Sequence, residues 1–362
     1  MDRRSFLRAS TVGAGAAAAS GLAAPAYAQG ARTLTMVTSV PHGFAVFDDA
    51  AVYFNEVVSA MTDGQITIDK KAAGELVGGF EVFDAVSSGQ ADMYHSADYY
   101  FGNQHPGYYY FTAVPFGATA EELSTWMYHG GGQELYDGLG QIFGLKSFHA
   151  GSTGMQPGGW FRKEINSADD LKGLKFRMPG IGGKALGLTG ASVQAIPGGE
   201  IYQALSSGAI DGAEWIGPFA DERLGFQEVC DYYYTSGFHE PGSALSVAFN
   251  LDIWESLTPA QQAIMEQAAK AATTHSLTQG IANNAAALRR IQSQGIKLME
   301  FDDTVWDAFG TASLTAMDEF MGDEMYAEIR TSFEESMRAS SDWLQRADRA
   351  YVQQRDRVLN RG

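Results

Sequence analysis

The residues with the clearest chemical potential are an arginine and a glutamate that each follow a strand-like segment. Arg177 lies in Gly173-Leu-Lys-Phe-Arg-Met-Pro179, and Glu214 lies in Ile210-Asp-Gly-Ala-Glu-Trp215. A guanidinium is planar and permanently charged, so it can hold a carboxylate through two parallel hydrogen bonds. An isolated arginine after a strand is more often part of a structural ion pair, so its neighbours decide the interpretation.

The elements around these two residues predict how they are positioned. Residues 174–178 alternate apolar and basic side chains and stop at Pro179-Gly180, which is typical of a strand that ends in a turn. Residues 198–205 have apolar positions at helical spacing, and a short strand-like run follows at 211–216. Ligands of open α/β sheets bind at the carboxyl ends of strands. We therefore expect Arg177 and Glu214 at one ligand-binding edge.

Oxygen donors form a second set of candidates. Gln156 stands in Thr153-Gly-Met-Gln-Pro-Gly158 and Glu240 in Gly237-Phe-His-Glu-Pro-Gly242, both beside Gly and Pro turns. With Glu214 and a main-chain carbonyl they would suit a hard cation such as Na⁺ or Ca²⁺, whereas zinc favours nitrogen and sulfur ligands. Without further context both are ordinary loop residues.

The spacing of these motifs resembles a known family. Gly-x-Lys-x-Arg, followed by Pro-x-x-Glu-x-Tyr-x-Ala-Leu-x-x-Gly-x-x-Asp-Gly-x-Glu, is similar to the periplasmic solute-binding proteins of TRAP transporters. More narrowly, it resembles the branch that binds 2-oxo acids such as pyruvate or 2-oxobutyrate. The resemblance extends over nearly the whole mature chain. It implies a two-lobe α/β periplasmic binding protein with a hinge, which catalyses no reaction and delivers its solute to a membrane permease.

The resemblance also implies roles for individual residues. Arg177 would clamp the substrate carboxylate, with Gln156 and Tyr100 as further substrate contacts, and Tyr100 is favoured over Tyr99 for that role. A cation, Na⁺ or Ca²⁺, would bridge to the same carboxylate. The residues implied as its ligands are Gln156, Glu214, Trp215 through its backbone oxygen, and Glu240.

Charge counting favours some cation at this site without selecting one. Arg177 contributes one positive charge, Glu214 and Glu240 two negative charges, and a monocarboxylate one more. A buried excess of negative charge is costly. Calcium would cancel the excess and sodium would leave one negative charge, so the identity of the ion stays open.

The first 28 residues read as an export signal. Arg3-Arg4-Ser-Phe-Leu-Arg8 precedes an Ala/Gly-rich stretch and an Ala26-Tyr-Ala28 cleavage site. The twin arginine indicates Tat export, with Sec export as the alternative because Asp2 stands where Tat signals usually have Ser or Thr. A retained anchor is disfavoured because the apolar segment is short. The expected location of the mature protein is the periplasm.

The charge of the chain limits its partners. The net charge is −18, and loss of the signal would bring it to about −20. Such an acidic chain repels nucleic acid and anionic membrane surfaces, and we find no basic cluster with interleaved aromatics. The single cysteine, Cys230, allows no internal disulfide and is expected to be a small buried hydrophobe.

Alternating strand-like and helix-like stretches indicate an α/β class with largely parallel sheets in two lobes. Strands are predicted at 33–39, 65–69, 144–148, 174–178, 192–196 and 212–216, and residues 243–250 are predicted as a strand that crosses back. A helix capped at Thr258-Pro259 should run to about Gln294. The predicted domains are lobe I at 29–152 plus 243–275, lobe II at 153–242 plus 276–325, and a C-terminal dimerisation helix at 326–362.

The tail has its own pattern. Apolar residues recur at three- or four-residue steps from Tyr326 to Tyr351, and a helix of about 35 residues would extend about 50 Å. Such a helix either lies along its own subunit or pairs with a second copy. The resemblance favours a homodimer made through these helices.

Two other functions fit parts of the sequence. A metal-dependent periplasmic enzyme is conceivable because two carboxylates near a hard metal can activate water. Against it, the sequence has no haem-binding Cys-x-x-Cys-His, no iron–sulfur cysteines and no strand-linked Gly-x-Gly-x-x-Gly. A ligand-sensing partner of a membrane receptor would share the same pocket and differ in the protein on which it docks. The solute's chain length stays open.

Overall fold

The computed structural model describes residues 30–359, so the predicted export signal at 1–28 lies outside the described residues. The elements below belong to a compact unit that begins at Thr33, apart from Arg32, which is the first residue of β1. Among residues 30–359, every helix is too short or too polar to cross a membrane.

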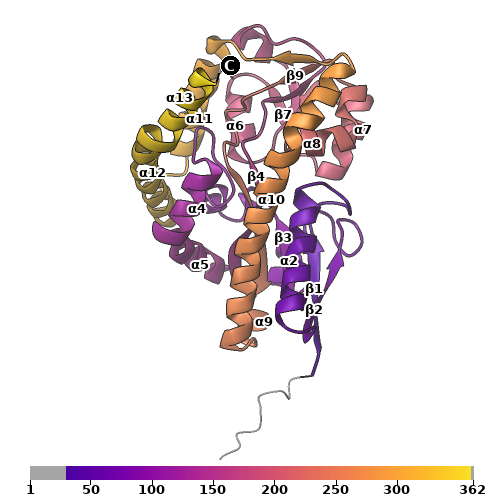
Figure 1. Cartoon of the computed structure of the whole chain (residues 1–362), viewed down its shortest axis with the longest axis vertical. Helices are drawn as coiled ribbons and strands as arrows, with labels where there is room; N and C mark the ends of the chain where they lie inside the picture. Colours follow the sequence, from indigo (N-terminus) through magenta and orange to yellow (C-terminus); the bar gives the residue numbers. More distant parts are fainter. Residues whose placement is uncertain (1–29, 360–362) are drawn as a thin grey trace, which may run out of the picture. The chain divides into compact units, whose positions relative to one another are not determined.

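Two separate sheets organise this unit (Figure 1). The first has five strands in the order β2 (Ile66–Lys71), β1 (Arg32–Thr38), β3 (Met93–Ser96), β10 (Ser243–Asn250) and β4 (Leu145–Gly154). The second has six strands in the order β11 (Lys297–Met299), β9 (Tyr232–Tyr234), β5 (Gly159–Phe161), β8 (Gly212–Ala213), β6 (Lys175–Arg177) and β7 (Ser192–Gln194). Both sheets therefore combine strands from distant parts of the sequence.

The prediction of largely parallel sheets is wrong, because both sheets are mixed. In the first sheet β1 and β3 are parallel, but β10 is antiparallel to both β3 and β4. In the second sheet β5 is antiparallel to β8 and β9, while β6 runs parallel to β7 and β8. Strand β10 brings the chain back in the direction opposite to β4. Side-chain periodicity reports which face of a strand is buried and carries no information on strand direction.

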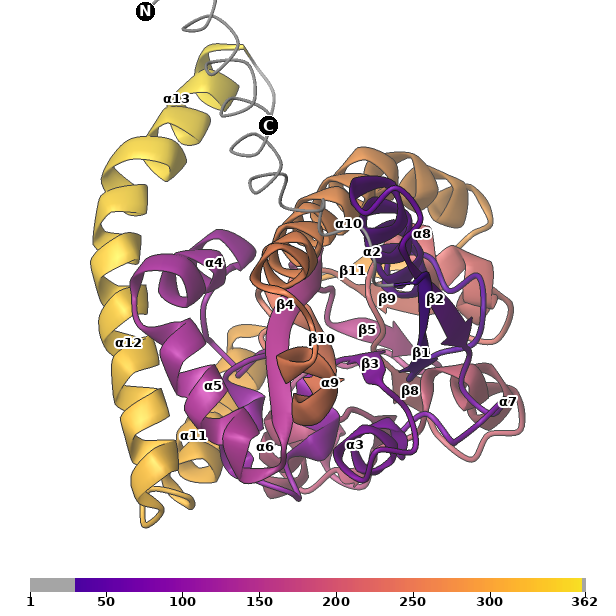
Figure 2. The ribbon, with the colours of Figure 1, turned by 90° about the horizontal axis from the view of Figure 1, so that it is seen from below.

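Helices surround the two sheets (Figure 2). The α-helices are α2 (Phe47–Met61), α3 (Val82–Ser87), α4 (Ala120–His129), α5 (Gly132–Ile142), α6 (Gly180–Leu188), α7 (Ile201–Ser206), α8 (Pro218–Asp221), α9 (Leu251–Glu255), α10 (Pro259–Ser293), α11 (Asp303–Asp318), α12 (Glu324–Leu344) and α13 (Ala350–Val358). Short 3₁₀ turns lie between them, including η1 (Asp98–Phe101) and η2 (Pro106–Tyr109).

Helix α10 begins where its capping residues predict. The Thr258 hydroxyl accepts a hydrogen bond from the Gln261 backbone N–H at 3.3 Å, and the Gln261 side chain accepts one from the Thr258 N–H at 2.9 Å. Pro259 occupies the first helical position, where its missing N–H costs nothing. The helix packs against β4 and α2 of the first sheet's side and against α8, which follows the second sheet's β8. Helix α10 thus contacts elements that belong to both sheets' sides of the unit.

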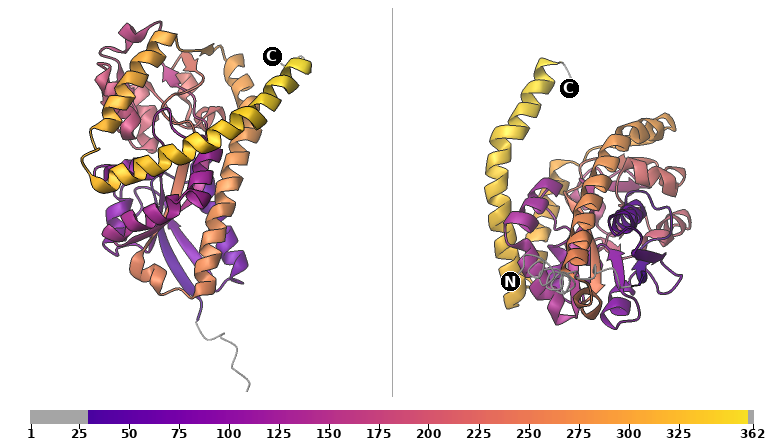
Figure 3. Two further views of the ribbon diagram at one scale, coloured as in Figure 1. Left: turned by 90° about the vertical axis from the view of Figure 1, so that its left-hand side faces the viewer. Right: turned by 60° about the horizontal axis from the view of Figure 1, so that its bottom comes forward.

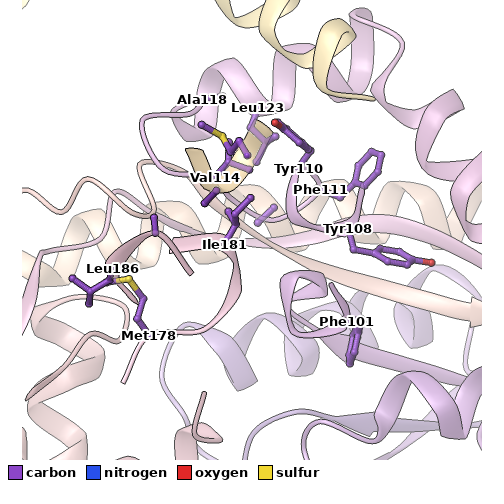
Figure 4. Close-up of a cluster of buried hydrophobic side chains, with 14 of the residues drawn as sticks. Phe101, Tyr108, Tyr110, Phe111, Val114, Ala118, Leu123, Met178, Ile181 and Leu186 are labelled. Carbon is purple, nitrogen blue, oxygen red and sulfur yellow. The ribbon is translucent and has the colours of Figure 1, made fainter. Parts of the chain in front are cut away.

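Buried side chains join elements that carry different sheets. One cluster brings Phe101 and Phe111, near the first sheet, together with Met178 and Ile181 beside the second (Figure 4). A second cluster contains Cys230, which is buried as expected, and burial raises the pKa of its thiol to about 12. Apolar packing therefore connects elements that carry the two sheets.

The C-terminal segment is helical from α12 through a π-helical turn, η7 (Gln345–Arg349), into α13 (Figure 3). Tyr326, Ile329 and Phe333 are buried where α12 packs on α4, α5 and η2. No described side chain from Gln345 to Val358 is buried, and Tyr351 is 66% exposed. The first part of the tail thus lies along its own subunit, while the last part leaves apolar groups uncovered.

Candidate ligand and cation site

Arg177 lies at the carboxyl end of β6 and is completely buried. Its Nε donates a hydrogen bond to the Ile196 carbonyl oxygen at 3.0 Å, and its Nη1 donates to the Glu214 carboxylate. Its Nη2 has no hydrogen-bond partner among the described residues. Burial lowers the pKa of Arg177, but the Glu214 carboxylate together with Tyr100 and Tyr99 outweighs this effect, and the net shift is upward. The guanidinium stays charged with one donor group free.

The sheet explains why Arg177 and Glu214 meet. Parallel strands β6 and β8 align Arg177 with Ala213, so Glu214 leaves its strand beside the arginine. Trp215 follows, and the Arg177 guanidinium carbon lies 5.4 Å from its ring centroid. The expected placement of Arg177 and Glu214 at one edge is what the structure shows. Their direct ion pair depends on the parallel pairing of β6 with β8, which could not be predicted from the sequence.

Gln156 and Glu240 come together from two loops. The Gln156 Nε2 donates to the Glu240 carboxylate at 2.7 Å and to the Thr153 hydroxyl at 3.2 Å. The backbone N–H of Gln156 also donates to the Glu240 carbonyl at 3.1 Å. These loops follow β4 and precede β10, which are neighbouring strands of the first sheet. Their pairing brings two residues 84 positions apart into one buried group.

Negative charge is concentrated in this group. Ligand atoms of Glu214, His239 and Glu240 all lie within 4.8 Å of one another, and all three residues are buried. Burial and, to a smaller extent, the nearby Glu214 carboxylate raise the pKa of Glu240 to about 7. The His239 Nε2 lies 3.7 Å from the second Glu214 oxygen. The structure therefore assembles a buried site with two carboxyl groups around one small volume.

The unsatisfied atoms of the site test whether a cation and a carboxylate fit it. Within the described part of the chain, Gln156 Oε1 and Glu214 Oε2 have no hydrogen-bond donor, and Arg177 Nη2 has no acceptor. Buried polar atoms without partners cost free energy. Oxygens of this kind are the ligands that Na⁺ and Ca²⁺ prefer. The free N–H group of the guanidinium would donate a hydrogen bond to a carboxylate. The residues present thus fit both groups.

Tyr100 and Tyr99 approach the same group from η1. Burial raises the pKa of Tyr100, and Arg177 is the charged group that most offsets this. Burial also raises the pKa of Tyr99, and Glu240 adds to that shift. The Tyr99 backbone N–H donates to the Thr112 hydroxyl at 3.0 Å, which fixes the turn. Both tyrosines therefore border the site, and the preference for Tyr100 stays a prediction.

Two residues of this region were missed by sequence reasoning. His239 was not among the candidates, yet its ring lies beside the Glu214 carboxylate. Asp221 accepts hydrogen bonds from the Trp160 indole N–H at 2.9 Å and from the backbone N–H groups of Ile216 and Gly217. It thereby fixes the loop after Trp215. The only available signal for His239 was its place beside Glu240 in a Gly/Pro loop.

Asp98 is a third missed residue, at the start of η1. Its carboxylate accepts hydrogen bonds from the Tyr94 hydroxyl at 3.1 Å and from the Tyr136 hydroxyl, which also lies 2.9 Å from Ser246 Oγ. Burial raises the pKa of Asp98 to about 7. The group links β3, α5 and β10 behind the turn that carries Tyr100.

Comparison with known proteins gives a consistent result over most of the chain. Residues 36–324 match the DctP family, described as bacterial extracellular solute-binding protein, family 7. A monocarboxylate 2-oxoacid-binding periplasmic protein of Nostoc sp. is 42% identical over 284 residues, which cover 78% of each of the two proteins.

Three solved structures with the same fold are described with a small acid and a cation. A TRAP solute-binding protein of Bordetella bronchiseptica, with calcium and picolinate in one site of a dimer, has a TM-score of 0.89 and 33% identity, covering 92% of this chain and 99% of that one. One from Pseudoalteromonas atlantica, with sodium and pyruvate, has a TM-score of 0.85 and 38% identity, covering 89% and 98%. One from Colwellia psychrerythraea, with calcium and pyruvate, has a TM-score of 0.85 and 37% identity, covering 89% and 99%. These likenesses confirm the predicted fold class.

Proposed function

This chain belongs to the DctP family of bacterial extracellular solute-binding proteins, which serve TRAP transporters, and on that premise we propose that its solute is a 2-oxo monocarboxylate. Pyruvate and 2-oxobutyrate are the simplest members of this class. The protein would capture the acid in the periplasm together with Na⁺ or Ca²⁺ and present it to the membrane permease. The relatives that contain pyruvate with either cation support this proposal.

One observation carries the proposal: the buried Arg177 guanidinium, paired with Glu214 through Nη1, keeps a second donor without a partner, and buried oxygens of Gln156 and Glu214 also lack partners. A monocarboxylate alone would satisfy Arg177 but would add a negative charge to Glu214 and Glu240. A cation alone would leave the arginine donor unpaired. The two together satisfy the donors and the acceptors, and the cation offsets the buried negative charge, completely for Ca²⁺ and to within one unit for Na⁺.

We assign roles by the contacts that each residue can make. Arg177 binds the substrate carboxylate, and Gln156 and Tyr100 contact the substrate from the first-sheet side. Gln156, Glu214, the Trp215 backbone oxygen and Glu240 hold the cation. When bound, the cation bridges to the substrate carboxylate and offsets the buried negative charge. The His239 Nε2, 3.7 Å from the second Glu214 oxygen, makes no hydrogen bond to it and stays outside the assigned ligands.

We infer that the protein acts by binding and release, without catalysis. Ligand contacts come from loops of both sheets, so they exist together only in the closed form, and a ligand would shift an open–closed equilibrium. The lobe boundaries stay our proposal: 29–152 plus 243–275 for lobe I and 153–242 plus 276–325 for lobe II. The allocation of strands to two sheets supports them.

We also propose that the protein forms a homodimer through the C-terminal segment 326–362. Trp343, Tyr351 and Val358 are 67%, 66% and 63% exposed, and an isolated helix with such apolar side chains gains by burying them against a second copy. The Bordetella bronchiseptica relative is described as a dimer, which supports this proposal.

The test of the proposed function is a calorimetric titration. The mature protein is unfolded and refolded to remove any bound ligand, and pyruvate is added with Na⁺, with Ca²⁺ and with a chelator in a sodium-free buffer. We expect binding that requires one of the cations. Binding without a cation would keep Arg177 and remove the cation role of Gln156, Glu214 and Glu240. Absence of binding under all conditions would refute a 2-oxo acid of this size.

A further inference from the structure

A cavity of about 370 Å³ lies beside the ligand site. Six aromatic side chains line most of it: Phe80, Phe83, Tyr99, Tyr100, Phe101 and Tyr109. Its opposite wall is formed by Pro179, Gly180 and Ala195 of the second-sheet side. The volume lies within the range of small-molecule sites, and an aromatic lining is typical of them.

The cavity directly adjoins the residues that hold Arg177. Pro179 and Gly180 follow Arg177 in the chain, and Ala195 precedes Ile196, whose carbonyl accepts the Arg177 Nε at 3.0 Å. Tyr100 lies between the two spaces, because it is close enough to Arg177 to change its pKa and also lines the cavity. The Tyr100 ring packs on Phe80 and Tyr99 at centroid distances of 4.7 and 4.8 Å. It therefore forms a partition between the charged site and the aromatic cavity.

The chemistry of the cavity decides which end of a ligand it accepts. None of the described residues that line it is basic, and its rim carries Asp84, whose carboxylate accepts a hydrogen bond from the Gln104 amide at 3.0 Å. A carboxylate would find no cationic partner there and would be repelled by Asp84. Burial of an apolar group against the aromatic rings is favourable. The cavity thus suits the uncharged end of an acid whose charged end is held by Arg177.

We propose that this cavity is the subsite for the apolar side chain of 2-oxo acids larger than pyruvate, with Tyr100 as the partition that determines how large a side chain enters. The inference rests on the proposed function, since it assumes a 2-oxo acid with its carboxylate on Arg177. Branched and aromatic side chains of four to seven carbons are the class that the volume and lining fit. Pyruvate would leave the cavity unused.

The test fills the cavity without changing the charged site. Ala195 is exposed on the cavity wall, so Ala195→Trp places a large ring in the space, and Ala195→Ser is the matched control with nearly unchanged volume. Each protein is titrated with pyruvate, 4-methyl-2-oxopentanoate and phenylpyruvate in the same cation. We expect Ala195→Trp to weaken the two larger acids by at least about tenfold and to change pyruvate affinity by less than about twofold. Ala195→Ser should change neither.

A second variant approaches the cavity from the other wall. Asn103 is exposed at the mouth, and Asn103→Trp should produce the same selective loss, which covers the case in which Ala195→Trp does not fold. Tyr100→Ala should weaken pyruvate but improve the ratio of phenylpyruvate to pyruvate affinity by at least about tenfold, because the partition is gone.

The outcomes separate this inference from the proposed function. If wild-type protein binds pyruvate but neither larger acid, or if both tryptophan variants leave all three affinities unchanged or weaken them equally, the subsite is refuted while the function stands. If wild-type protein binds none of the acids, the proposed function fails and the subsite fails with it.

Discussion

Asp98 gives the most quantitative prediction, because its buried carboxyl group links the stability of the protein to pH. The pKa of Asp98 is raised from 3.8 to about 7 by burial, and hydrogen bonds from Tyr136 and Tyr94 only partly offset this. One pKa unit corresponds to about 1.4 kcal/mol, so the shift corresponds to about 4 kcal/mol of pH-dependent stability. The folded state binds a proton at Asp98 more tightly than the unfolded state. This stabilisation is therefore complete below about pH 4 and is lost as the pH rises through about 7.

The perturbation is Asp98→Asn, which keeps the shape and one acceptor oxygen for the Tyr136 hydroxyl but cannot ionise. The free energy of unfolding is measured by urea denaturation of ligand-free protein with a chelator, from about pH 4 to about pH 8. We expect the difference between wild type and Asp98→Asn to shift by up to about 4 kcal/mol in favour of the variant over this range. Other buried acids, such as Glu240 and Asp221, are present in both proteins, so their contributions to the pH dependence of the unfolding free energy cancel in the difference.

Asp307→Asn is the control, since Asp307 is exposed on α11 and its replacement should leave the pH dependence unchanged. If the difference in unfolding free energy between wild type and Asp98→Asn stays constant with pH within about 1 kcal/mol, Asp98 does not titrate with a raised pKa. The reasoning from burial would then be refuted for this group.

Three further predictions concern the site and the tail. Arg177→Ala should abolish measurable pyruvate binding, and Arg177→Lys should weaken it by at least about tenfold because an ammonium cannot form two parallel hydrogen bonds. Lys175→Ala changes an exposed side chain of the same strand and is the control for the calorimetric titration. Wild-type affinity in Arg177→Ala would contradict the assignment. Glu240→Gln removes one negative charge from the cation site, so the Ca²⁺ concentration needed for half-maximal pyruvate binding should rise by at least about tenfold; an unchanged requirement would exclude Glu240 as a ligand. Deletion of residues 345–362 removes the uncovered part of the tail while keeping the segment that packs on α4, and light scattering should show a monomer, whereas an unchanged dimer would place the interface elsewhere.

Local chemistry in the sequence determined several elements closely. The strand predicted at 243–250 matches β10, and the helix predicted from Thr258-Pro259 to about Gln294 matches α10, because its start depends on a capping residue and a proline at fixed offsets. Arg177 was placed at a strand end by the turn that follows it. The family resemblance, which rests on motif spacing, is confirmed by the comparisons.

The tertiary structure decided everything that depends on which distant segments meet. The mixed character of the sheets follows from the return of β10 between β3 and β4, and the alternation of side chains along a strand is the same in both directions. The contact of His239 with Glu214 and the hydrogen bonds of Asp98 to Tyr136 join residues far apart in the chain. Burial and pKa shifts are properties of the assembled surroundings of a group. A sequence lists the groups that can ionise or coordinate, and only the packed chain sets their distances and removes them from water.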